Sequence, residues 1–151
     1  MKHPLRGLLA YLLATAAFLI MLIAAGVFDP KPVGQRQTVL PETSLTVSQP
    51  GQSIRWLREP LPAGDFSLRA TAVWQTGTQD SGVGLAVDDF VVAVSPLGYV
   101  LVQQAGEPVL PWQPWPHVQP GGNPNELWLD IRGSEISVRI NRELLMRRQH
   151  K

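Results

Sequence analysis

The sequence predicts an all-β protein, an antiparallel jelly-roll-like β-sandwich preceded by one transmembrane α-helix. Residues 7–28 contain no charged side chain, which indicates a membrane-spanning helix. Beyond residue 40, short stretches of alternating apolar and polar residues are separated by turns that contain Pro and Gly. The chain has 14 Pro and 13 Gly among 151 residues, which favours many turns over long helices.

The uncharged segment, residues 7–28, is long enough to cross a bilayer. As a helix it spans about 33 Å, against a hydrocarbon core of about 30 Å. We interpret it as an uncleaved signal anchor, and a cleaved signal peptide is the alternative because residues 24–26 are small. Lys2 and Arg6 precede the segment. They favour a short cytoplasmic N-terminus, residues 1–6, with the rest of the chain outside the cytoplasm.

After the helix we expect a linker and then the extracytoplasmic sandwich. Residues 29–40 contain Pro, Gly and charged side chains, as linkers do. Residues 41–151 form the expected sandwich. Within it, residues 66–75 alternate apolar and polar side chains, which predicts a strand with one buried face.

Residues 83–103 predict a three-strand meander. If Asp88 and Asp89 form a two-residue turn, every facing pair on one face of the hairpin is apolar, which supports this strand register. The pairs on that one face are Val87 with Phe90, Leu85 with Val92, and Val83 with Val94.

Residues 127–140 predict a hairpin around Gly133 and Ser134, with Gly133 in the first central position of a type II′ turn. On the other face Trp128 lies opposite Arg139, which suits a cation–π contact. The facing apolar pairs are Ile131 with Ile136, Leu129 with Val138, and Leu127 with Ile140. Before this hairpin, residues 111–122 are rich in Trp, Pro and Gly without a regular period.

Several motifs of this region match a known family. They are the Gly-rich pair "GVGLAVDDFVVAV", the turn Ser95-Pro96-Leu97-Gly98, Trp115, Asn125 with Leu127, Gly133 with Ile136, and Asn141. Over about residues 65–145 the chain resembles the concanavalin A-like lectin and glucanase jelly rolls. The most similar type is the laminin-G-like or 3-keto-disaccharide hydrolase module. The resemblance implies a sandwich fold, in which the Trp-containing segment, residues 111–122, crosses between the sheets as a loop. As one function it implies carbohydrate binding.

The chain departs from this family in two places. Arg142 follows Asn141 where the family usually has Gly, and the family normally continues for further strands after this turn. We therefore expect the last residues to form one short closing strand or to leave a sheet edge open. A partner chain would cover such an edge, by strand addition or by simple contact.

Composition excludes several function classes. The chain has no Cys, which excludes disulfides, thiolate metal sites and a Cys nucleophile. Its 13 Lys and Arg balance 12 Asp and Glu, so no nucleic-acid partner is expected. Glycosidases of the related fold need two carboxylates that flank the scissile bond. The acids here are scattered along the sequence, so we expect no enzyme, with a glycan hydrolase as the poorly supported alternative.

Five residues are candidates for ligand or metal binding. Trp112, Trp115 and His117 are the ligand-binding candidates, because aromatic rings stack on sugar faces. Burial in the core or in an interface is the alternative for both Trp residues. Asp80 and Asp88 lie in acidic, loop-like sequence and are the candidate ligands of a Ca²⁺ ion. No other cofactor is expected.

The expected function is a non-catalytic, membrane-anchored interaction domain, an accessory subunit of a membrane protein assembly. Its expected location is the cell membrane, as a single-pass protein with its C-terminal domain outside the cytoplasm. The partners are the lipid bilayer and a protein in the same membrane, contacted through Trp128, Arg139 and Arg142. The alternative function is a carbohydrate-binding module of the cell envelope.

Overall fold

The computed structural model describes residues 4–34, 44, 46 and 61–149. Within them the chain forms one helix and eight strands, which confirms the predicted all-β class with one N-terminal apolar helix. The chain divides into two compact units, Met1–Lys31 and Pro32–Lys151, and each is described by itself.

The first unit contains helix α1 (Pro4–Ala24). Its segment Gly7–Ala24 is long and apolar enough to cross a membrane, and a signal sequence near the N-terminus meets the same test. The helix begins earlier and ends earlier than the uncharged segment 7–28 predicts. Pro4 suits the first helical turn, because its missing N–H would have no intrahelical partner there.

A C-terminal cap explains why α1 stops before Phe28. Gly26 adopts φ +68°, a left-handed conformation that glycine takes without a steric penalty. The Gly26 N–H donates to the Ile23 carbonyl at 3.0 Å, and the Val27 N–H donates to the Leu22 carbonyl at 3.1 Å. These two bonds form a Schellman motif, which satisfies carbonyls that the helix end would otherwise leave unpaired.

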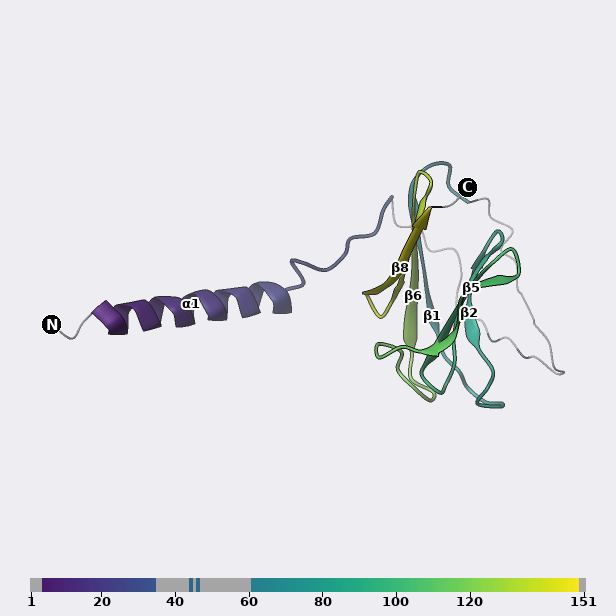
Figure 1. Ribbon diagram of the computed structural model, residues 1–151, viewed down its shortest axis with the longest axis horizontal. Coiled ribbons are helices and arrows are strands. Elements are labelled where there is room, and N and C mark those ends of the chain that lie inside the picture. Colours follow the sequence, from purple (N-terminus) through teal and green to yellow (C-terminus); the bar gives the residue numbers. More distant parts are fainter. Residues whose placement is uncertain (1–3, 35–43, 45, 47–60, 150–151) are drawn as a thin grey trace. The chain divides into compact units, whose positions relative to one another are not determined.

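In the second unit, two antiparallel four-stranded sheets form a sandwich-like pair. Figure 1 shows them as separate layers, with β1, β6 and β8 labelled in one layer and β2 and β5 in the other. The first sheet has the strand order β2-β3-β4-β5. Its strands are β2 (Val83–Val87), β3 (Phe90–Val94), β4 (Tyr99–Gln104) and β5 (Glu107–Pro114).

The predicted register of the β2–β3 hairpin is confirmed. Asp88 and Asp89 form the turn, and Asp88 adopts φ +51°. The facing pairs are those predicted, Val83 with Val94, Leu85 with Val92, and Val87 with Phe90. Strand β4 completes the predicted meander by pairing with β3.

Strand β5 corrects the prediction for the Trp- and Pro-rich segment. Residues that we expected to belong to a loop, Pro111 to Pro114, lie in β5, and among them Gln113 and Pro114 pair with β4. The pairing shifts register between Val100 and Val102 and again before Gln103. An edge strand tolerates Pro, because a Pro nitrogen that faces away from β4 loses no ladder hydrogen bond. The irregular register also explains why no period-2 pattern was visible.

The second sheet has the strand order β1-β6-β7-β8. The predicted β6–β7 register is confirmed, with Leu127 opposite Ile140, Leu129 opposite Val138, and Ile131 opposite Ile136. Gly133 adopts φ +54°, as the first central residue of a type II′ turn requires. The strands are β1 (Phe66–Ala72), β6 (Asn125–Arg132), β7 (Glu135–Ile140) and β8 (Glu143–Gln149).

Strand β8 decides between the two expectations for the end of the chain. It is a closing strand of seven residues that pairs antiparallel with β7. Asn141 and Arg142 form the two-residue connection, and both have positive φ, +51° and +74°. Two positive φ values are typical of a type I′ turn, which joins twisted strands tightly. Among the described strands, β8 is itself an edge of its sheet.

The core lies between the two sheets. It consists of apolar side chains that the alternation placed on the facing sides of the strands, and the largest fully buried members are Phe90, Leu127, Leu129, Ile140, Val92, Val94, Val100, Val102 and Val138. Ile131, Leu68 and Trp115 are partly buried against it. Burial of these alternating side chains is the main favourable term that holds the sheets together.

The second face of β6 and β7 also contains buried side chains. Trp128 is 1% exposed, Asp130 is 5% exposed and Ser137 is 6% exposed. An ionised carboxylate as deeply buried as that of Asp130 requires partners, because burial without them is costly. Those partners form the polar network described below.

Candidate functional site

Three large apolar side chains share one shallow pocket of the first sheet. Leu97 is 51% exposed, Tyr99 is 38% exposed and Trp112 is 42% exposed. Together with Asp80 and Ser95 they line a pocket of about 190 Å³. We call this pocket the Trp112 groove. Most of its accessible lining is apolar, and the Asp80 carboxylate is the one charged group among its five lining residues.

Glycine at position 82 lets the Trp112 ring lie where it does. A Cβ built on Gly82 would come within 2.7 Å of Trp112 Cη2, closer than real Cβ contacts allow, and within 3.5 Å of the Ala93 Cβ. The indole therefore lies over the residue that precedes β2 and beside a small side chain of β3. The absence of a side chain at Gly82 places an aromatic ring from β5 over the opposite edge of its own sheet.

Trp115 and His117 do not belong to this groove. Trp115 packs against the hydrophobic core, and its ring lies 5.7 Å from the His117 ring, tilted by 53°. The backbone N–H of Trp115 donates to the Gly98 carbonyl at 3.0 Å. The core alternative is therefore the one that the structure supports for Trp115, whereas Trp112 remains exposed.

Two asparagines hold the loop that carries His117. Asn141 Nδ2 donates to the His117 carbonyl at 2.6 Å and to Asn125 Oδ1 at 2.9 Å. Asn125, which is 3% exposed, accepts from the Gln119 N–H at 2.8 Å. These contacts give Asn125 and Asn141 a structural role in joining β6, β7 and the loop before β6.

The two candidate calcium ligands lie at opposite ends of β2. Asp80 precedes the strand and lines the Trp112 groove, whereas Asp88 forms the turn after it. A five-residue strand separates them by more than about 13 Å, several times a Ca²⁺–oxygen bond. Among the described residues, no three His, Cys, Asp or Glu side chains are grouped for metal binding. Calcium binding by this chain stays a prediction.

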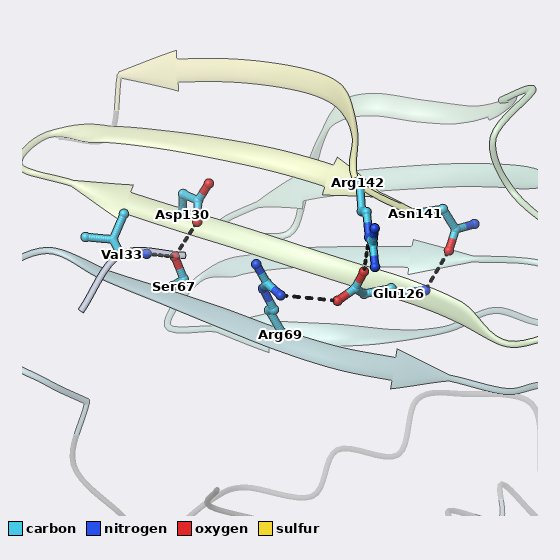
Figure 2. A network of polar contacts seen from close by, with 7 residues as sticks. All are labelled: Val33, Ser67, Arg69, Glu126, Asp130, Asn141 and Arg142. Atoms are coloured by element: carbon cyan, nitrogen blue, oxygen red, sulfur yellow. Dashed lines mark hydrogen bonds and ion pairs between the residues drawn. The ribbon is translucent and has the colours of Figure 1, made fainter. Parts of the chain in front are cut away.

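A polar network crosses the second face of the sheet that contains β1, β6 and β7 (Figure 2). In its first part, Ser67 Oγ donates to Asp130 Oδ1 in a short contact and accepts the Val33 N–H at 2.6 Å. On its other side, Asp130 Oδ2 lies 3.9 Å from Arg139 Nε. The buried carboxylate therefore has a hydroxyl on one side and a guanidinium on the other.

The second part of the network surrounds Glu126. Its carboxylate lies 3.7 Å from Arg69 Nη1 and 3.8 Å from Arg142 Nε, and Figure 2 shows it between the two guanidinium groups. The Glu126 N–H donates to Asn141 Oδ1 at 2.8 Å. Arg69 and Glu126 have side chains 37% and 30% exposed, so water screens this pair and its contribution to stability is small.

The candidate partner contacts, Trp128, Arg139 and Arg142, have different environments. The guanidinium over the Trp128 ring is that of Arg69, 3.2 Å from the ring centroid, rather than the predicted Arg139. Arg139 instead lies near Asp130 and donates to the Arg142 carbonyl at 3.2 Å. Trp128 is a packed side chain of the sheet, and Arg142, 62% exposed, presents the most side chain to solvent.

The groove residues Ser95, Leu97 and Tyr99 were missing from the sequence candidates. A signal for Tyr99 existed, because Val100 and Val102 face the core and the alternation turns Tyr99 outward. No comparable signal existed for Leu97 and Ser95, which lie in the turn between β3 and β4. Their contact with Trp112 depends on the pairing of β4 with β5.

Comparisons with known proteins give no family for this chain: no family model, no curated protein and no solved structure matches it.

Proposed function

We propose that this chain is a non-catalytic, membrane-anchored interaction module that contacts a protein partner through the Trp112 groove. The single observation that supports the proposal is the gathering of Leu97, Tyr99 and Trp112, all exposed, in one pocket. Exposed apolar side chains that lie together are typical of interaction sites, and Trp and Tyr are frequent interface anchors. We place the sandwich outside the cytoplasm, as the flanking charges Lys2 and Arg6 favour.

We infer the relationship to the concanavalin A-like jelly rolls from the sequence motifs. The two antiparallel four-stranded sheets are compatible with it. We propose no catalytic role for Asp130 and Glu126, because their carboxylates contact arginine or hydroxyl side chains in the fold. Such carboxylates serve the packing of the sheet.

The test is affinity purification of the tagged full-length protein from native membranes in a mild detergent, followed by mass spectrometry. We expect a stoichiometric membrane partner that Trp112→Ala reduces at least about tenfold, because truncating an interface anchor typically costs about 2 kcal/mol or more. Leu144→Ala is the matched control, since Leu144 is 41% exposed but lies on β8 of the other sheet.

Each other outcome contradicts a definite part of the proposal. A monomer without a partner would refute the accessory-subunit function. Loss of the partner with Leu144→Ala, and not with Trp112→Ala, would move the contact to the C-terminal edge strand.

Carbohydrate binding at the same groove is the second candidate. Tyr99 and Trp112 supply rings that stack on sugar faces, and Asp80 supplies a carboxylate that accepts sugar hydroxyl hydrogen bonds. A glycan array probed with the full-length protein in detergent would show binding that Trp112→Ala and Asp80→Asn both abolish. Binding that survives both substitutions would place the sugar elsewhere, and an empty array would reject this candidate.

A further inference from the structure

Val33, which follows the apolar helix, is held on the edge of β1 that faces away from β6. Among the described strands, β1 pairs with β6 alone. On its other side the Ser67 N–H donates to the Val33 carbonyl at 3.2 Å, and the Val33 N–H donates to Ser67 Oγ at 2.6 Å. Residue 33 therefore belongs with the sandwich, in agreement with the start of the second unit at Pro32.

A buried carboxylate supports this attachment. Ser67 Oγ, which accepts from Val33, donates its own proton to Asp130 Oδ1, and Arg139 lies on the far side of that carboxylate. A hydroxyl that donates to an ionised carboxylate becomes a better acceptor, because hydrogen bonds in a chain polarise one another. Figure 2 shows Val33, Ser67 and Asp130 in this order. We call these three residues the neck clamp.

The clamp leaves a short connection to the helix. Helix α1 ends at Ala24, so residues 25–32 are the only residues between it and Val33. Fully extended, they span at most about 30 Å. Residues 25–29 also form hydrogen-bonded turns, and Pro30 and Pro32 restrict the rest of the connection. The usable reach is thus shorter than that of the whole segment 29–40, which the sequence alone predicts as the linker.

We propose that the neck clamp limits the reach of the sandwich, because it keeps Val33 within about 30 Å of the end of α1. The partner is then a protein whose contact surface lies no further from the membrane that holds α1 than this distance plus the length of the sandwich. This inference rests on the proposed function only for the existence of a partner. The clamp itself is a property of the fold and is tested separately.

The clamp is tested by cross-linking in the full-length protein in detergent. The chain has no native Cys, so Val33→Cys with Ser67→Cys creates one defined pair. Because Ser67→Cys removes the hydroxyl, this pair tests the position of residue 33 beside β1, and amide exchange tests the hydrogen bonds. Mild oxidation should join this pair, and mass spectrometry of non-reduced peptides detects the link. The control pair is Val33→Cys with Thr71→Cys, four residues further along β1 and about 13 Å away. Equal cross-linking of both pairs, or of neither, would overturn the clamp.

Amide exchange tests the hydrogen bonds without the cross-link. In the wild-type protein we expect the Val33 amide to be protected, and Ser67→Ala to accelerate its exchange at least about tenfold. Ser67→Thr keeps the hydroxyl and should keep the protection, which a general loss of stability would not explain. Exchange of the wild-type Val33 amide at the rate of a free peptide would contradict the clamp.

The reach is tested by lengthening the neck. Insertion of about 20 Gly and Ser residues between Lys31 and Pro32 adds a flexible coil of about 25 Å root-mean-square length and leaves the clamp intact. Partner recovery should fall several-fold, because the effective concentration near the membrane falls. Unchanged recovery would refute the limit on reach. A cross-linked neck without any partner would instead refute the proposed function and leave the clamp standing.

Discussion

At the scale of single residues, the turn between β7 and β8 places Arg142 in an unfavourable backbone conformation. Asn141 accepts positive φ readily, because its short side chain tolerates the left-handed region. Arg142 adopts φ +74° as well, although its Cβ disfavours that conformation. The Arg142 side chain gains an ion pair with Glu126 at 3.8 Å, but it is 62% exposed, and such pairs contribute about 0–1 kcal/mol. The strain therefore outweighs the ion pair.

Arg142→Gly should stabilise the protein by roughly 0.5–1 kcal/mol, because glycine relieves about 1–2 kcal/mol of left-handed strain and loses the weak ion pair. Arg142→Ala is the matched control, since it removes the ion pair and keeps the strain. Thermal unfolding of the full-length proteins in the same detergent measures both. A glycine variant no more stable than the alanine variant would contradict the explanation.

Trp112 and Trp115 are three residues apart in the sequence but have different roles in the fold. Trp112 lies on irregular edge strand β5 and reaches over Gly82, whereas Trp115 follows the strand and packs on the core. Both positions carry the same residue type in the same Pro-rich sequence. Their roles depend on the register shifts of β5 against β4, which the local sequence does not indicate.

At the scale of elements, the β2–β3 hairpin depends on one close backbone approach. A Cβ built on Gly84 would lie 2.0 Å from the Val92 carbonyl oxygen and 2.8 Å from the Ala93 Cα. Both neighbours are backbone atoms, so no side-chain rotation relieves the clash. Glycine inside a strand often marks such an approach. The predicted alternation placed the apolar residues correctly and did not identify this requirement.

Gly84→Ala should therefore destabilise the protein by about 2–3 kcal/mol, as overpacking that displaces backbone does. Ala86→Ser, at the next position on the same face of β2, should change stability by less than about 1 kcal/mol. Thermal unfolding of both variants beside the wild type makes the comparison. Similar stability of Gly84→Ala and Ala86→Ser would show that β2 moves away from β3 without cost.

The hairpins also show why register was predictable for some elements. In β2–β3 and β6–β7, a slip of one residue would turn every apolar side chain away from the core. The two turns and the alternation therefore specify the pairing together, and the structure has that pairing. Strand β8 has no such alternation, and its pairing with β7 shifts register after Val138.

At the scale of the whole molecule, orientation across the membrane is a prediction from the charges that flank the helix. Arg148→Cys on β8 and His3→Cys before the helix give two single-cysteine proteins that keep Lys2 and Arg6, because the chain has no native Cys. We expect a membrane-impermeant maleimide to label the first in intact cells and the second only after lysis. The reverse pattern would place the sandwich in the cytoplasm.

Labelling also tests whether the helix remains attached. The mass of the Arg148→Cys protein after labelling distinguishes the full chain from one that has lost its N-terminal segment. We expect the full chain in the membrane fraction, because the apolar helix persists as an anchor. A shorter, soluble product would show that the segment is a cleaved signal peptide.

The sequence by itself determined the fold class, the apolar helix and the register of two hairpins. Each of these depends on a local pattern, either the length of an uncharged run or the period-2 alternation that gives a strand one buried face. Tertiary structure alone decided which residues meet across long sequence separations. Arg69 rather than Arg139 covers Trp128, and Tyr99 rather than Trp115 joins Trp112.

The same holds for the neck clamp, in which Val33, Ser67 and Asp130 come from distant parts of the chain. Their contact requires β1 to pair with β6 on one edge and to meet residue 33 on the other. No local pattern encodes that arrangement. Burial of the apolar face specifies how strands pair, and the positions of polar groups on the opposite face follow only after the sheets have assembled.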